Sequence, residues 1–159
     1  MDNILLLERI EEAKTAVFQK PEETMPEKLA AYLEAKQIKT YTHQAEAYDQ
    51  VSRGENIIVT TPTASGKTLS CLLPVFAKLL ENPDATALLI YPTKALTRDQ
   101  LLTIEEMDSL LQAKTRPAIY DGDTKQEARA RIRTRSRIIL TNMYELHHIL
   151  PCRAKWGDF

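Results

Sequence analysis

The chain has 159 residues, 43% of them hydrophobic, which is enough for one domain with a sizeable core and too few for two domains of ordinary size. Its 21 Lys and Arg residues nearly balance its 22 Asp and Glu residues, giving a net charge of -1, so any nucleic-acid binding must depend on a local group of charges. No apolar run spans a bilayer, no signal peptide opens the chain, and the separate cysteines Cys71 and Cys152 fit neither a zinc site nor a disulfide framework, so we expect a cytoplasmic protein with no membrane partner.

The first 40 residues are predicted to be a helical lead-in. Apolar residues recur there at helical spacing, with a break at the PEETMPE segment, at Ile4, Leu7, Ile10, Leu29 and Leu33. A further helix is predicted from about His43 to Arg53, and it stops at Gly54, whose missing Cβ suits a left-handed helix end. We therefore divide the chain into a helical extension over residues 1–40 and a main domain over residues 41–159.

Four short β-branched or aliphatic runs follow, each succeeded by a helix-like segment. They are NIIVTT (56–61), TALLIY (86–91), PAIYDG (117–122) and SRIILT (136–141). Runs this uniformly apolar are expected where both faces of a sheet are covered, and the intervening helices supply the right-handed crossovers that parallel strands require. The sequence therefore predicts an α/β fold with a parallel sheet.

The run TPTASGKT, between the first predicted strand and an apolar helix, is typical of a phosphate-binding loop. Its candidate nucleotide contacts are Thr61, Pro62, Thr63, Ala64, Ser65, Gly66, Lys67 and Thr68. Gly66 permits close approach of the backbone, Lys67 supplies positive charge to the β and γ phosphates, and the Thr68 hydroxyl is a candidate Mg²⁺ ligand. Thr61 replaces the first glycine of the general pattern, which leaves a solvated turn capping a core helix as the alternative.

The loop resembles that of superfamily 2 (DEAD/DEAH-box) helicases, which commonly reads (A/T)-P-T-x-S-G-K-T and so accommodates Thr61. PTKALTRDQ (92–100), YDGDT (120–124) and ILTNMYELHHILP (139–151) are similar to motifs Ia, Ib and Ic of that family and occur in its order. The combination most resembles the MrfA-type (YprA-like) DNA-repair helicases, over roughly residues 29–159. This resemblance implies a RecA-like fold, ATP and Mg²⁺ as cofactors, and nucleic acid as partner, with DNA favoured over RNA.

The resemblance also implies particular site residues. In YTHQAEA, Gln44 matches the glutamine that reads adenine, and Tyr41 is the candidate aromatic residue against the base; Lys67 and Thr68 are the implied catalytic contacts. The candidate nucleic-acid contacts are Pro92, Thr93, Lys94, Arg98, Gly122, Asp123, Thr124, Thr141 and Asn142. They follow strand ends, where parallel sheets bind ligands, and they are of types that hold phosphates without reading bases. On its own, YDGDT would be read as an ordinary Asp-Gly turn.

Three weaker signals favour structural interpretations. KQEARARIRTRSR (125–137) could follow a nucleic-acid backbone, but its interleaved apolar residues favour the solvated face of a crossover helix. Cys71, within an apolar helix, is interpreted as a buried small hydrophobe. His147 and His148 lack further metal-ligand partners in the sequence and are expected on a helix surface or an interface.

A helicase of this family also carries a D-E-x-H box, an S-A-T motif and a second RecA-like domain with an arginine finger, and the sequence contains none of these. We therefore expect an incomplete RecA-like domain, truncated from a longer protein, that binds ATP without turning it over. The strand over residues 56–61 would keep an unpaired edge, because the S-A-T strand normally lies beside it. A non-motor, nucleotide-regulated nucleic-acid-binding module and an RNA helicase fragment remain as alternatives, and a small P-loop kinase is a remote one.

Overall fold

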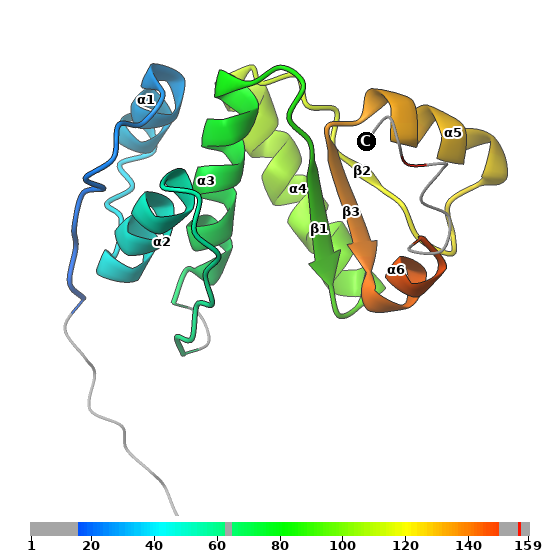
Figure 1. The fold of residues 1–159 in the computed structure, drawn as a ribbon, viewed down its shortest axis with the longest axis horizontal. Helices are drawn as coiled ribbons and strands as arrows, with labels where there is room; N and C mark the ends of the chain where they lie inside the picture. Colours follow the sequence, from blue (N-terminus) through cyan, green and yellow to red (C-terminus); the bar gives the residue numbers. More distant parts are fainter. Residues whose placement is uncertain (1–15, 63–64, 150–155, 157–159) are drawn as a thin grey trace, which may run out of the picture.

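The computed structural model describes residues 16–62, 65–149 and 156, and these residues form helices and strands in alternation from α3 onward (Figure 1). The elements are α1 (Glu27–Ala35), α2 (Thr42–Ser52), α3 (Lys67–Glu81), β1 (Ala87–Tyr91), α4 (Lys94–Leu111), β2 (Ala118–Ile119), α5 (Gln126–Arg135), β3 (Ile138–Asn142) and α6 (Met143–Ile149). The helix expected around residues 4–10 and the end of the predicted motif Ic, residues 150–151, lie outside the described residues. None of the described helices is long and apolar enough to cross a membrane.

The three strands form one parallel sheet in the order β1-β3-β2, which confirms the predicted α/β class. Ile138 pairs with Ala87 of β1, and Ile139 pairs with Ala118 of β2. Alternate residues of β3 point to opposite faces of the sheet. Ile138 belongs to the core shared with α3 and α4, whereas Ile139 packs on the other side with Tyr120 and Ile149.

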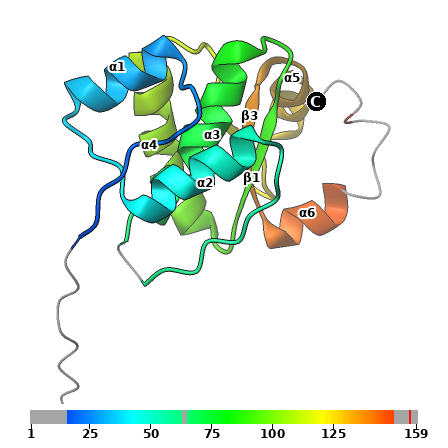
Figure 2. The ribbon, with the colours of Figure 1, turned by 60° about the vertical axis from the view of Figure 1, so that its left-hand side comes forward.

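The larger core runs from the N-terminal helices through α3 and α4 to the sheet. Its fully buried large side chains include Leu29, Tyr48, Leu72, Leu73, Phe76, Ile104, Met107, Leu111, Ile138 and Leu140. Figure 2 shows α2 crossing in front of α3 and α1 beside it near α4, and Figure 1 shows both helices on the side of α3 away from the sheet. Leu29 of α1 therefore shares a core with the rest of the domain, and the division of the chain at residue 40 stays a prediction.

Helix α2 ends as the sequence predicts. Its last residue is Ser52, Arg53 caps it, and Gly54 has φ +86°. A residue with a Cβ is unfavourable in this left-handed conformation, so glycine is the suitable residue after the helix.

The predicted strand over residues 56–61 is wrong: the structure has irregular backbone there, and Ile58 is 91% exposed. A strand requires a hydrogen-bonded neighbour, and in the described part of the chain β1 pairs only with β3. The apolar sequence of this segment is suited to a strand, but no strand among the described residues pairs with it.

The interpretation of Cys71 as a buried residue is also wrong, since its side chain is exposed on α3. The helix buries the stripe that contains Leu72, Leu73 and Phe76. Cys71 lies with Thr68 and Lys78, three and seven residues away, on the opposite stripe. Partial desolvation still raises the pKa of the Cys71 thiol.

Arg137 joins segments that are far apart in the sequence. Its Nε donates to the Ala85 carbonyl at 3.0 Å, and its Nη2 donates to the carbonyls of Leu79 at 2.8 Å and Asn82 at 2.5 Å. The side chain thus fastens the end of α3 and the approach to β1 against the start of β3.

Candidate functional site

The predicted phosphate loop leads directly into α3. Gly66 is the N-cap of this helix with φ +79° and ψ 25°, and no side chain caps the helix start. The first amides of α3 and the positive end of its dipole are therefore available to an anion. A Cβ on Gly66 would lie 2.5 Å from Nε2 of Gln44, so the backbone conformation favours glycine and any other residue would displace the Gln44 amide.

Lys67 lies at the centre of this loop. Its ammonium donates to the carbonyl oxygens of Thr61 at 2.7 Å and Pro62 at 2.5 Å. The hydroxyl groups of Thr61 and Ser65 are 2.6 Å apart and close the loop across its base. Phosphate oxygens can replace the two carbonyls as acceptors for this ammonium. Thr63 and Ala64 lie outside the described residues.

Gln44 joins α2 to the loop. Its side chain is buried, its Oε1 accepts from the Tyr41 amide at 2.9 Å, and its Nε2 donates to the Gly66 carbonyl at 3.0 Å. The structure therefore brings the predicted adenine-reading residue into direct contact with the phosphate loop.

Tyr41 is the middle ring of an aromatic stack that sequence reasoning found only in part. Its ring centroid lies 5.1 Å from that of Phe18 at an interplanar angle of 19°, and 5.7 Å from that of His43 at 9°. Phe18 reaches this position through an antiparallel bridge with Tyr41. His43 could have been found from its position beside Tyr41, but nothing in the local sequence marks Phe18, because the contact joins distant segments.

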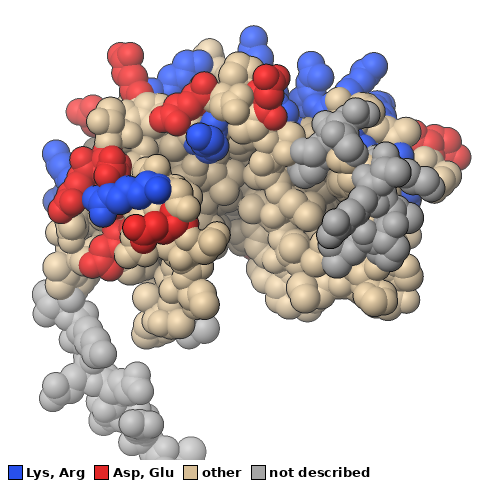
Figure 3. Space-filling model, viewed as in Figure 1, with Lys and Arg blue, Asp and Glu red and all other residues tan. Residues whose placement is uncertain are grey.

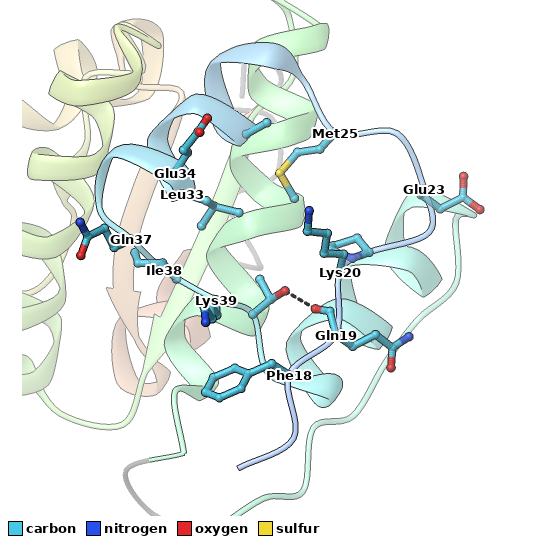
Figure 4. Close-up of a pocket in the computed structure, with 13 residues that line it drawn as sticks. Phe18, Gln19, Lys20, Glu23, Met25, Leu33, Glu34, Gln37, Ile38 and Lys39 are labelled. Carbon is cyan, nitrogen blue, oxygen red and sulfur yellow. Dashed lines mark hydrogen bonds between the residues drawn. The ribbon is translucent and has the colours of Figure 1, made fainter.

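A hollow of about 1050 Å³ adjoins this stack (Figure 4). Phe18, Met25 and Leu33 contribute apolar lining from the N-terminal segment and α1, and the charged side chains of Lys20 and Glu34 border it. The Thr40 hydroxyl donates to the Gln19 carbonyl within it. Of the aromatic stack, only Phe18 lines this hollow, so it lies beside the candidate adenine position rather than over the phosphate loop.

Thr68 is exposed in the first turn of α3, next to Lys67. Among the residues that the structure describes, no group of three His, Cys, Asp or Glu could hold a metal ion. A Mg²⁺ ion at Thr68 would therefore take its other ligands from nucleotide phosphates and water. This is the coordination that Mg²⁺ commonly has in nucleotide sites, so the residues present fit this ion.

The predicted motif segments meet beyond the carboxyl ends of the strands, and an ion-pair cluster joins two of them. Asp123 accepts from Lys94 Nζ at 2.7 Å through Oδ1 and from Arg98 Nη2 at 3.2 Å through Oδ2. The hydrogen bond from Lys94 lowers the pKa of Asp123, and the same bond raises the pKa of Lys94. Pro92 and Thr93 are exposed beside this cluster, and Thr93 caps α4 by accepting from the Leu96 amide at 3.2 Å.

Several other candidate contacts hold the strand ends in place. The Thr124 hydroxyl accepts from the Asp121 amide at 2.9 Å, and the buried Thr141 hydroxyl donates to the Tyr120 carbonyl at 2.7 Å. Asn142, also buried, accepts from the Glu145 amide at 2.9 Å. These groups organise the site from within, and their contact with nucleic acid stays a prediction. Gly122 is exposed, and a Cβ there would lie 3.9 Å from Lys94 Nζ.

Arg129 is a site residue that sequence reasoning missed. No residue of α5 is buried, as expected for the solvated face, but the Arg129 side chain turns inward. Its Nε donates to Thr124 O at 3.1 Å, its Nη2 to Asp121 O at 2.8 Å, and its Nη1 to Glu145 Oε1 at 2.8 Å. Its guanidinium also lies 4.7 Å from the centroid of the Tyr120 ring. Arg129 therefore fastens the YDGDT turn to α6. His147 and His148 are exposed on α6, as predicted.

Comparisons with known proteins agree with this arrangement. The family model described as DEAD/DEAH box helicase matches residues 41–158. The chain is 39% identical over 136 residues to the uncharacterized ATP-dependent helicase YprA of Bacillus subtilis (strain 168), covering 84% of this chain and 18% of the relative. It is 42% identical over 122 residues to the ATP-dependent helicase HRQ1 of Saccharomyces cerevisiae, covering 75% of this chain and 11% of the relative.

Solved structures give the same result. The DUF1998 helicase MrfA bound to DNA and AMPPNP superposes with a TM-score of 0.86 and 37% identity, over 91% of this chain and 21% of that one. The Mycobacterium smegmatis helicase Lhr bound to ssDNA and AMP-PNP superposes with a TM-score of 0.64 over 78% of this chain and 18% of that one, and at 22% identity it supports the fold alone. The expected RecA-like fold is confirmed. This chain spans about a fifth or less of the length of these relatives.

Proposed function

This chain belongs to the DEAD/DEAH box helicase family, and we propose on that premise that it is the ATP-binding and nucleic-acid-binding part of an ATP-dependent helicase acting on DNA. The observation that carries the proposal is the phosphate loop, in which the Lys67 ammonium lies between backbone carbonyls at the uncapped start of α3. This is a preformed position for a polyphosphate.

In the proposed complex, the Lys67 ammonium exchanges its two carbonyl acceptors for oxygens of the β and γ phosphates. Gly66 and the first amides of α3 bind the same phosphates, and the Thr68 hydroxyl ligates Mg²⁺. The ion, when bound, neutralises part of the phosphate charge. Gln44 and Tyr41 lie on the adenine side. The AMPPNP in the MrfA structure supports ATP as the nucleotide.

Nucleic acid is proposed to bind beyond the carboxyl ends of the strands, at Lys94, Arg98 and the YDGDT turn. Cations, hydroxyls and exposed amides there suit a phosphodiester backbone of any sequence. The DNA in the MrfA structure favours DNA over RNA, since backbone contacts alone do not separate the two. Retained binding of single strands without ATPase activity, measured on the full-length protein, would favour the alternative of a non-motor module.

Turnover is proposed to need groups outside these 159 residues, because the sequence contains no D-E-x-H box. Without that acidic pair the attacking water is not oriented, so the isolated chain is proposed to bind ATP and not hydrolyse it. In the working helicase a second RecA-like domain would supply the arginine finger. A cytoplasmic location belongs to the proposal as well, supported by two cysteines that form no disulfide framework pattern in the sequence.

Titration with a fluorescent ATP analogue in the presence of Mg²⁺ tests the nucleotide site. Lys67→Ala is expected to weaken binding by about tenfold or more, since a charge-assisted contact to the phosphates is lost. Lys78→Ala, at the exposed far end of the same helix, is the matched control and should bind like the wild type. Equal affinity for the wild type and Lys67→Ala would refute the assignment.

A further inference from the structure

Four cations gather at the end of the sheet opposite the candidate nucleic-acid site. Lys114 and Arg116 precede β2, and Arg131 and Arg135 lie in the second half of α5, ahead of β3. All three strands are parallel, so the segments before them lie at the other end of the sheet from the motif segments that follow them. A strand of five residues separates the two ends by about 16 Å. We name these four residues the rear patch. In the view of Figure 3 the strands begin at the upper edge, where Lys and Arg side chains project together with some Asp and Glu side chains.

Three residues of the rear patch, Arg116, Arg131 and Arg135, line a shallow hollow of about 330 Å³. The residues that line it are Arg116, Pro117, Ala118, Arg131, Ile132, Arg135 and Ser136. Neither a carboxylate nor an aromatic side chain is among them. In the described part of the chain, the four side chains of the rear patch make no ion pair or hydrogen bond. The structure therefore places several positive charges around one hollow whose lining contains no carboxylate, an arrangement that an anion stabilises.

The backbone of the loop before β2 directs two of these charges outward. Lys114 has φ +56° and Arg116 has φ +52°, which is the left-handed region that residues with a Cβ rarely adopt. Between them Thr115 is fully buried, and both its amide and its hydroxyl donate to Asp108 Oδ1, at 2.9 Å and 2.7 Å. Its carbonyl accepts from the Arg137 amide at 2.7 Å. The loop is thus firmly held, with a cation on each side of its buried residue. Strain of this kind gathers at binding sites.

Helix α5 divides its arginines between two roles. Arg129 and Arg133 turn toward Tyr120, and Arg133 Nη1 donates to the Tyr120 hydroxyl at 3.0 Å. Arg131 and Arg135 are exposed and lie two residues after these, on the other side of the helix. The basic segment over residues 125–137 therefore contains two kinds of arginine. Arg129 and Arg133 point inward and hold the YDGDT turn, whereas Arg131 and Arg135 point outward and belong to the rear patch.

We propose that the rear patch binds the phosphodiester backbone of nucleic acid, as a second site in addition to the candidate nucleic-acid site at the carboxyl ends of the strands. Guanidinium groups pair with phosphate oxygens through parallel hydrogen bonds, and nucleic-acid interfaces are polar and strongly positive. An acidic protein partner fits less well, because the hollow lacks the Trp and Tyr anchors that, together with Arg, are enriched at the hot spots of protein interfaces. Phosphates repeat about every 3.4 Å along each strand of a duplex, so a bound nucleic acid has a backbone long enough to reach both ends of the sheet.

The decisive variant is Lys114→Gly/Arg116→Gly, because glycine suits a positive φ and the substitution removes two charges without straining the loop. We expect its melting midpoint to equal or exceed that of the wild type. Its affinity for DNA should fall by about tenfold or more at low salt, and the slope of log K against log salt should become shallower by about 2 for duplex DNA. Arg131→Gln/Arg135→Gln should have the same effect on binding. Gln37→Gly, another positive-φ position, and Lys28→Gln, a charge lost from α1, are the matched controls and should bind like the wild type.

A 20-base-pair duplex and a 30-nucleotide single strand are titrated separately. Loss of affinity for the duplex alone assigns the rear patch to duplex, and loss for both assigns it to any phosphodiester backbone; either result supports the proposal. Unchanged affinity and salt slope for both probes would overturn it. It would also be overturned if the rear-patch variants lost affinity for poly-glutamate but kept their affinity for DNA. Lys94→Gln/Arg98→Gln tests the candidate nucleic-acid site at the carboxyl ends of the strands in parallel. If this variant binds DNA normally while the rear-patch variants do not, the proposed function of that site fails and the rear-patch site stands.

Discussion

Replacing Arg129 with methionine should destabilise the fold more than the same replacement of any other arginine of α5. Methionine keeps an unbranched side chain but leaves the Glu145 carboxylate, which is 7% exposed, without its partner at 2.8 Å. The carbonyls of Asp121 and Thr124 also lose their donors. Removing one partner of a buried ion pair costs about 3–5 kcal/mol, and because the Arg129 side chain is 21% exposed we expect the lower end, about 3 kcal/mol. In a domain of this size that lowers the melting midpoint by about 6–12 °C.

Urea unfolding of a double-mutant cycle measures this contribution. Arg129→Met, Glu145→Met and the double variant are compared by midpoint and slope. The double variant should lose less than the sum of the single losses, because it buries no unpaired charge. Arg131→Met, exposed and two residues away, is the matched control and should change the free energy of unfolding by less than about 0.5 kcal/mol. A loss below about 1 kcal/mol for Arg129→Met, or strict additivity in the cycle, would refute this reasoning.

Further predictions concern the loop and the ion-pair cluster. Gly66→Ala should lose about 1–2 kcal/mol of unfolding free energy in urea and bind nucleotide more weakly, because φ is +79° and the new Cβ meets Gln44; an unchanged midpoint would contradict this. Gln44→Glu should lose about 2–3 kcal/mol, more than Gln44→Ala, because a carboxylate oxygen would face the Gly66 carbonyl, and the opposite order would show that Nε2 matters little. NMR titration should place the pKa of Asp123 below 3.8, with a rise in Lys94→Gln. Since the pKa of Asp123 is lowered in the folded protein, the ion pair stabilises the fold at pH values above the unfolded pKa, and this stabilisation is lost as the pH falls through the folded pKa. Equal titration midpoints of Asp123 in the wild type and in Lys94→Gln would disprove the role of Lys94.

The helices and two of the three observed strands follow closely from local sequence. Gly54 marks the end of α2, and the runs at 86–91 and 136–141 contain β1 and β3 almost residue for residue. The run at 117–122 yields only the two-residue strand β2. The run at 56–61 shows the limit of such reasoning, because strand propensity is local whereas a strand forms only beside a hydrogen-bonded neighbour.

Some residues of the candidate site could likewise be predicted from the sequence, and others could not. The phosphate loop and Gln44 could be located from sequence, because their residue types and spacing repeat within a known family pattern. Arg129 and Phe18 could not, because their roles depend on contacts that arise only after folding: Arg129 meets Glu145 sixteen residues later, and Phe18 meets Tyr41 across an antiparallel bridge. A basic stripe gives no sign of which arginines will turn inward.

The contacts of Arg137 also bear on the order in which this chain folds. Its hydrogen bonds to Ala85 and Leu79 join residues 52 and 58 positions apart, and they connect α3 to a strand that is reached only after α4, β2 and α5. Contacts of such long range require closure of a large loop before they form, so they are expected to form later in folding than local helix contacts. The Arg137 interactions should therefore form after the folding barrier, and their loss should accelerate unfolding while leaving the folding rate nearly unchanged.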